Sequence, residues 1–205
     1  MSTQNPYDSW HRLSHLAIIY VLLHPYYHLS YRLRIEGHGN IPQSPFLIVS
    51  NHFSYSDPTL LSLTFRRPVA YLAKQELFQE KLLGPIISYL GAVPVNREKP
   101  APSTLKKLKQ IVSEQGWSIG IFIEGTRNLT RGKITKLEAG AAFIAKITGG
   151  ISVVPVGIIG GEKKGDSLTV RVGEAIPFDP NLTLDQMTLK YGRAIASLSE
   201  QKLEI

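Results

Sequence analysis

Short apolar runs alternate with helical segments along most of this 205-residue chain, and this alternation limits its possible folds more than any other feature. The clearest apolar runs are PFLIVSNH at 45–52, SIGIFIEGTR at 118–127 and ISVVPVGIIG at 151–160. Between two of them, STLKKLKQIVSEQG at 103–116 places apolar residues at helical spacing. Strands that alternate with helices predict an α/β domain with a mostly parallel central sheet flanked by helices.

The rest of the chain continues this pattern. We expect further strands at 68–74, 93–97 and 168–176, the last of which alternates in the manner of an edge strand. We expect further helices at 57–65, 76–92, 138–150 and 182–203. The region 76–92 is expected to break near Gly84 and Pro85, and Ser103 is expected to cap the helix that follows it.

The composition excludes several kinds of site and favours one class of partner. The chain has no cysteine, which excludes disulfides, thiol nucleophiles and cysteine-type zinc sites, and nothing in it implies a metal or a redox cofactor. Its formal charge of +7 favours anionic partners such as anionic lipids or phosphorylated small molecules. Signatures of nucleic-acid-binding modules are absent from the sequence, so we expect no nucleic-acid partner.

The N-terminal segment LSHLAIIYVLLHPYYHLSY at 13–31 differs from the rest of the chain. Its uninterrupted apolar part, 16–23, is far shorter than the ~20 residues of a spanning helix, and Pro25 is expected to kink or end a helix. Flanking arginines and tyrosines are typical of a helix at a membrane interface, although a helix buried on the domain is the alternative. We therefore divide the chain into a membrane-associating helical segment at 1–34 and an α/β domain at 35–205.

Polar residues follow several of the predicted strands, at the sheet edge where ligands of α/β proteins gather. In NHFSYSD, at 51–57, His52 lies on the loop that leaves a strand, and Asp57 with Pro58 resembles a helix N-cap. If the loop folds back, Asp57 orients His52 as a general base that deprotonates a hydroxyl. No G-x-S-x-G nucleophile motif is present, which favours direct transfer; the alternative is that Asp57 is only a cap.

Two arginines also follow strands. Arg97 and Arg127 could grip a phosphate with their guanidinium forks, and Gly125 would allow backbone N–H groups to approach it. The alternative is that both arginines form ordinary surface ion pairs, in the case of Arg127 with Glu124 or Glu138.

Four blocks together, NHFSYSD, GAVPVNR, FIEGTRN and VVPVGII, resemble in order and spacing those of the glycerolipid acyltransferases, the PlsC-like lysophosphatidic acid acyltransferase family. The resemblance covers roughly residues 35–180. It implies that His52 is the catalytic base, that Asp57 orients it and that Arg97 binds the acceptor phosphate. Further residues that the resemblance places at the substrate site are Glu124, Gly125, Thr126 and Arg127 around the acceptor, Lys74 and Lys136 near the phosphate, and Pro155 on the acyl side. The chain departs from the family pattern at Ile123, where proline is usual, and at Asn128, where serine is frequent.

The resemblance implies an enzyme of phospholipid biosynthesis that moves a fatty acyl group from acyl-CoA or acyl-carrier protein to the free hydroxyl of 1-acyl-glycerol 3-phosphate. The product would be phosphatidic acid, and the protein would be peripheral or monotopic on the cytoplasmic face of a membrane with anionic lipid. Two alternatives stay open. The acceptor could be lysophosphatidylglycerol or glycerol 3-phosphate, or the protein could be a non-catalytic basic lipid-binding protein.

Overall fold

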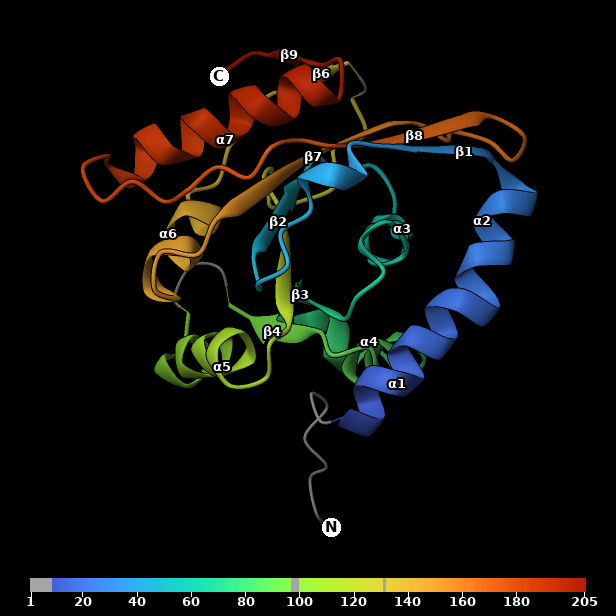
Figure 1. Ribbon diagram of the computed structural model, residues 1–205, viewed down its shortest axis with the longest axis horizontal. Helices are drawn as coiled ribbons and strands as arrows, with labels where there is room; N and C mark the ends of the chain where they lie inside the picture. Colours follow the sequence, from blue (N-terminus) through green and yellow to red (C-terminus); the bar gives the residue numbers. More distant parts are fainter. Residues whose placement is uncertain (1–8, 97–99, 131) are drawn as a thin grey trace.

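The structure is a computed structural model, and it describes residues 9–96, 100–130 and 132–205. Within these residues, seven strands form a central sheet in the order β1-β8-β7-β2-β5-β3-β4 (Figure 1). Their bounds are Arg32–Glu36 for β1, Leu47–Ser50 for β2, Val69–Lys74 for β3, Val93–Val95 for β4, Ser118–Phe122 for β5, Val153–Gly160 for β7 and Ser167–Val172 for β8. A separate pair joins β6, Lys133–Ile134, to β9, Lys202–Leu203.

All neighbouring strands of the central sheet are parallel except β7 and β8, which are antiparallel. The predicted α/β fold with a mostly parallel sheet is confirmed. Every residue of β2 is buried, which is typical of a parallel strand covered on both faces and explains its continuous apolar sequence.

Helices cover both faces of the sheet (Figure 1). Buried side chains of α5, Pro102–Ser113, α6, Gly140–Ile147, and α7, Leu184–Leu198, pack in one core with Leu47 and Val49 of β2. On the other face, α3, Asp57–Phe65, and the N-terminal helix pack in a second core that includes Ile48. Successive residues of β2 therefore enter opposite cores, as the pleat of a strand requires.

The N-terminal helix runs as α1, Ser9–Ile18, a π-helical turn, η1, Ile19–Leu23, and α2, His24–Ser30. Pro25 does not end the helix, which was one of the two outcomes expected there. Pro25 lies in the first turn of α2, and the wider turn before it, where the His24 N–H donates to the Ile19 carbonyl, relieves the clash that proline makes with a preceding carbonyl. None of the described helices is both long and apolar enough to cross a membrane.

At the β1 side of the sheet, one prediction needs correction and one strand was not predicted. The strand predicted as an edge, β8, is flanked on both sides, by β7 and by β1. The edge is β1, whose charged residues alternate with half-buried ones, so its sequence RLRIE lacks an apolar run. The short helix η2, His38–Asn40, then leads into β2.

Three helix boundaries also differ from the predictions. The helix predicted at 182–203 ends at Leu198, and its last predicted residues pair with β6 as β9. The region 76–92 forms a 3₁₀ helix, η3, Gln75–Gln79, and α4, Leu83–Tyr89, with the break at 80–82. Gly84 and Pro85 lie in the first turn of α4, where a helix tolerates proline. Ala101, rather than Ser103, is the N-cap of α5, and Pro102 is the first helical residue.

Candidate active site

The loop between β2 and α3 brings His52 and Asp57 together. The His52 Nδ1 lies 2.8 Å from the Asp57 Oδ2, and the same oxygen accepts hydrogen bonds from the backbone N–H groups of Phe53 at 2.7 Å and Ser54 at 2.8 Å. Asp57 is only 3% exposed. A carboxylate on Nδ1 favours the tautomer that leaves Nε2 free to accept a proton.

The carboxylate of Asp57 does not cap α3, contrary to the N-cap interpretation. Ser56 occupies the N-cap position without a side-chain cap, and Asp57 is the first helical residue. Its side chain turns back to the loop and bonds the two N–H groups there. The turn is further stabilised by the Asp57 N–H, which donates to the Ser54 carbonyl at 3.1 Å. The loop conformation and the orientation of the imidazole thus depend on one carboxylate.

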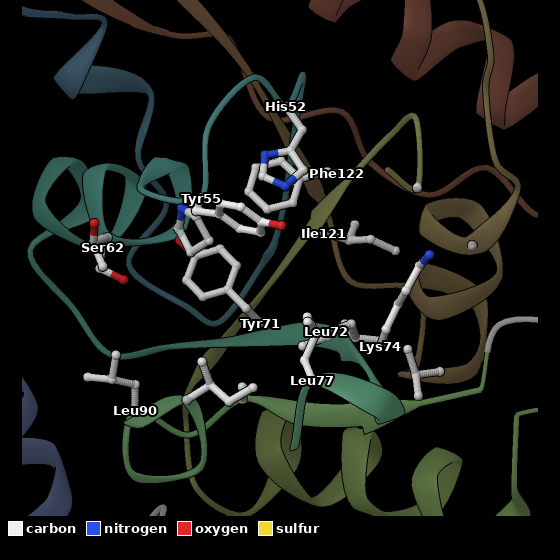
Figure 2. Close-up of a pocket in the computed structure, with 18 of the residues that line it drawn as sticks. His52, Tyr55, Ser62, Tyr71, Leu72, Lys74, Leu77, Leu90, Ile121 and Phe122 are labelled. Atoms are coloured by element: carbon white, nitrogen blue, oxygen red, sulfur yellow. The ribbon is translucent and has the colours of Figure 1, made fainter. Parts of the chain in front are cut away.

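Phe122, the last residue of β5, fixes the plane of the His52 imidazole. The two rings are stacked with their centroids 3.8 Å apart and an angle of 12° between their planes (Figure 2). The His52 side chain is 14% exposed, and its Nε2 has no hydrogen-bond partner among the described residues. Sequence reasoning missed this contact, because nothing in the apolar run 118–122 singles out its last residue.

Buried hydrogen bonds of the Asn51 side chain also hold the His52 loop in place. The Asn51 side chain donates to the Ile158 carbonyl at 2.9 Å and accepts from the Ile158 N–H at 2.8 Å, which ties the loop to β7. It also donates to the Gln201 side chain at 3.0 Å, close to the C-terminus. Gln201 carried no sequence signal, because it lies 150 residues away from its partner.

Residues 124–127 form the turn after β5 and lie against the His52 loop. The Asn128 N–H donates to the His52 carbonyl at 2.8 Å. Glu124 is buried, and this burial raises the pKa of its carboxyl, an effect opposed by hydrogen bonds from the Asn128 side chain and the His52 backbone. Gly125 has a φ of +68°, a conformation that favours glycine, and its N–H donates to the Phe122 carbonyl. Gly125 therefore allows the backbone to turn at this point.

The Arg127 guanidinium stacks on the aromatic ring of Tyr55. Its guanidinium carbon lies 3.6 Å from the centroid of the Tyr55 ring, a short cation–π distance. Among the described residues, no carboxylate pairs with Arg127. Glu138, one of the partners considered for it, pairs instead with Lys136 at 2.6 Å.

The other candidate residues are more scattered. Lys74 ends β3 and lines the same pocket as His52 and Arg127, and Gly125 and Thr126 also line it. The remaining three candidates are placed differently: Lys136 is exposed in its pair with Glu138, Pro155 is buried in β7 beside Val49 of β2, and Arg97 lies outside the described residues.

The pocket has a volume of about 770 Å³, within the range of small-molecule sites, and its walls are mostly apolar. In Figure 2, His52, Tyr55 and Phe122 cluster together, whereas Leu72, Leu77 and Leu90 lie on the opposite side of the pocket. The apolar lining residues include Ile18, Ile19 and Leu23 of the N-terminal helix, Leu72 of β3, Leu83 and Ile87 of α4, Leu105 and Leu108 of α5, and Phe143 and Ile144 of α6. A hydrogen-bonded histidine and a stacked arginine thus share one pocket with a long apolar surface.

This fold and site define an α/β protein with a carboxylate-bonded histidine in the wall of an apolar pocket. Residues 32–159 match the Acyltransferase family, and the chain belongs to this family.

Named relatives agree with this assignment. A 1-acyl-sn-glycerol-3-phosphate acyltransferase of Borreliella burgdorferi is 33% identical over 127 residues, which are 61% of this chain and 50% of the relative. The enzyme of that name from Bacillus subtilis is 34% identical over 117 residues, 54% of this chain and 58% of the relative. The chain thus spans about half the length of these relatives. The crystal structure of the 1-acyl-sn-glycerophosphate acyltransferase PlsC from Thermotoga maritima matches with a TM-score of 0.73 and 26% identity, over 90% of this chain and 78% of that one.

Proposed function

We propose that this protein is an O-acyltransferase that moves a fatty acyl group from a thioester to the free hydroxyl of 1-acyl-glycerol 3-phosphate, forming phosphatidic acid. The observation that carries the proposal is the His52–Asp57 pair, 2.8 Å apart, in the wall of a large apolar pocket that also contains Arg127. The family and the names of the relatives support the choice of acceptor. The donor is acyl-CoA or acyl-carrier protein, both of which are anionic and suit a chain with a charge of +7.

In the proposed mechanism, His52 Nε2 accepts the proton of the acceptor hydroxyl as the hydroxyl oxygen attacks the thioester carbonyl. Asp57 stabilises the imidazolium that forms, and Phe122 keeps the ring in its plane. The carbon–sulfur bond then breaks, and the imidazolium returns its proton to the departing thiolate. The new carbon–oxygen ester bond replaces the thioester, and His52 is neutral again.

Cationic groups bind the acceptor phosphate in this proposal. Arg127 and Lys74 line the same pocket as His52, and a guanidinium matches the geometry of a phosphate with two parallel hydrogen bonds. We assign Arg97 and Lys136 to the same phosphate environment. Glu124, Gly125 and Thr126 shape the turn beside it, and Pro155 supports the apolar side from β7. The fatty acyl chain lies along the apolar walls.

We further propose that the protein associates with the surface of an anionic membrane, on the cytoplasmic face, through the segment 1–34, with the acyltransferase domain at 35–205. The N-terminal helix exposes six large apolar or aromatic side chains: Leu13, Tyr20, Val21, Leu22, Tyr26 and Leu29. The same helix lines the pocket with Ile18, Ile19 and Leu23. A helix bound at the interface would therefore place the pocket beside the lipid phase from which its substrates come.

The proposal is tested by acyl transfer from labelled acyl-CoA and acyl-carrier protein to lysophosphatidic acid, with lysophosphatidylglycerol and glycerol 3-phosphate as competing acceptors. We expect fastest turnover on lysophosphatidic acid and loss of product with His52→Ala. Faster turnover on another acceptor would overturn the choice of acceptor but keep the chemistry. Equal lipid binding by wild type and His52→Ala, with no product from either, would favour a non-catalytic lipid-binding protein.

A further inference from the structure

Tyr55 lies on the His52 loop but takes no part in the mechanism above. It is the third residue after His52, and 68% of its surface is exposed. Its ring lies 3.6 Å from the guanidinium carbon of Arg127, and both residues line the main pocket. A large aromatic side chain at an exposed loop tip gains little from burial, so its stacking on the guanidinium is its principal described contact.

Besides the hydrogen bond from the His52 backbone to the Glu124 carboxyl, two contacts join the His52 loop to the turn that carries Arg127. The backbone contact is the hydrogen bond of 2.8 Å from the Asn128 N–H to the His52 carbonyl. The side-chain contact is the stack of Arg127 on Tyr55. Because the base and the arginine belong to loops bonded in this way, the position of one constrains the position of the other.

Stacking occupies a face of the guanidinium and leaves the N–H groups, which lie in its plane, available to a ligand. No described residue hydrogen-bonds the Arg127 side chain or forms an ion pair with it. An arginine without such contacts would otherwise sample many rotamers, and ordering it on binding would weaken the affinity for the ligand. Stacking on the Tyr55 ring restricts the rotamers of Arg127 before a ligand binds.

We propose that Tyr55 is a positioning residue that holds the Arg127 guanidinium in place to bind the phosphate of the acceptor. This inference rests on the proposed function in that it takes the anionic ligand to be the phosphomonoester of the acceptor. It predicts that the ring matters, not the hydroxyl. Tyr55→Phe should therefore behave as wild type, whereas Tyr55→Leu, of similar apolar character but without the ring face, should not.

The kinetic test compares wild type, Tyr55→Leu and Tyr55→Phe in acyl transfer to lysophosphatidic acid. In Tyr55→Leu we expect the KM for the acceptor to rise roughly 2- to 5-fold, the range for an exposed cation–π contact, with little change in kcat or in the KM for the donor. In an Arg127→Ala background, Tyr55→Leu should add nothing. An unchanged acceptor KM in Tyr55→Leu, or an equal further loss in the Arg127→Ala background, would overturn the proposal.

A second measurement does not depend on turnover. The Nε–H signal of Arg127 in the NMR spectrum is assigned by its loss in Arg127→Lys, and the Tyr55 ring should shift it in wild type and Tyr55→Phe but not in Tyr55→Leu. Titration with glycerol 3-phosphate should move this signal at lower concentration in wild type than in Tyr55→Leu. Equal titrations would overturn the positioning role. If these differences appear although wild type transfers no acyl group, the proposed function fails and the role of Tyr55 stands.

Discussion

The His52 loop and the N-terminal helix both line the pocket, but they are held by opposite means. The loop is fixed by directional hydrogen bonds: three donors converge on one oxygen of Asp57, and Asn51 bonds both polar groups of Ile158. The helix instead leaves much of its apolar surface exposed, with Leu29 at 88%. A side chain that is to accept a proton must be held in one orientation, which directional hydrogen bonds provide. Contact with lipid requires only exposed apolar surface.

Tyr27 connects these two regions by hydrogen bonds. Tyr27 of α2 is buried, and its hydroxyl donates to the Ser56 carbonyl at 2.8 Å, with the Thr59 hydroxyl also 2.8 Å away. Ser56 immediately precedes Asp57 at the start of α3. The helix is therefore attached to the loop that orients His52, although several of its large apolar side chains are exposed.

The largest effect is expected at the proton acceptor. His52→Ala should reduce kcat by about a hundredfold or more, because a positioned general base contributes at least that factor. The free energy of unfolding should change little, since the loop is held by Asp57 and Asn51. His38→Ala is the matched control, because His38 is exposed on η2 and does not line the pocket. Activity retained in His52→Ala would contradict the mechanism.

Asp57→Ala should differ from His52→Ala by reducing both activity and stability. It removes the acceptor of the Phe53 and Ser54 N–H groups as well as the partner of His52. An N–H left without an acceptor costs about 1–3 kcal/mol when it is fully buried, and these two are partly buried, so we expect a loss towards the lower end of that range for each. Urea unfolding measures this loss. If Asp57→Ala unfolded at the same urea concentration as His52→Ala, the carboxylate would not be what holds the loop.

The burial of His15 in the N-terminal helix can be tested by the pH dependence of stability. Burial lowers the pKa of His15 from 6.5 to about 4, so the folded protein keeps His15 neutral at pH values where the unfolded chain binds a proton. Stability should therefore fall as the pH drops from 6.5 to 4 and should be unaffected by this group above 6.5. When the pH is lowered from 7 to 4.5, the free energy of unfolding should fall by about 2–3 kcal/mol less in His15→Leu than in wild type, as measured by denaturant unfolding. Parallel pH profiles would show that His15 is not buried.

Phe122→Leu tests whether stacking fixes the plane of the imidazole. We expect kcat to fall about 2- to 10-fold, in line with the energy of an aromatic pair. The KM for the acceptor should change less, because the Arg127–Tyr55 stack is separate from Phe122. Phe122→Tyr keeps the ring and serves as the control. If Phe122→Leu and Phe122→Tyr had the same kcat, the stacking would have no part in orienting His52.

The smallest effect is expected on the exposed face of the helix. Leu29→Ser should weaken binding to vesicles of anionic lipid by roughly fivefold, the effect of withdrawing about 40 Å² of apolar surface from lipid. Turnover of a soluble short-chain acceptor should stay the same. Leu129→Ser is a control, since Leu129 is also exposed but lies outside the N-terminal helix. Equal vesicle binding by both variants would place the membrane contact elsewhere.

Much of the architecture follows from local patterns. The helix predicted at 57–65 has those bounds in the structure, and the strand predicted at 68–74 forms at Val69–Lys74. Such segments are predictable because the spacing of apolar residues depends on near neighbours only. The prediction failed at β1, whose charged sequence RLRIE forms a strand only because β8 offers a partner at the sheet edge. A helix end at Pro25, one of the two outcomes expected there, does not occur, because a π-helical turn lets the helix continue.

At the site, the amino-acid sequence was sufficient to place His52, Asp57 and residues 124–127 at strand ends, because parallel strands bring their carboxyl ends to one edge. Three contacts depended on the folded chain: Phe122 on His52, Tyr55 on Arg127, and Gln201 on Asn51. They join residues 70 to 150 positions apart, and which of these meet depends on the order of strands in the sheet. Local spacing carries no information about that order, so tertiary packing alone established how the site is held.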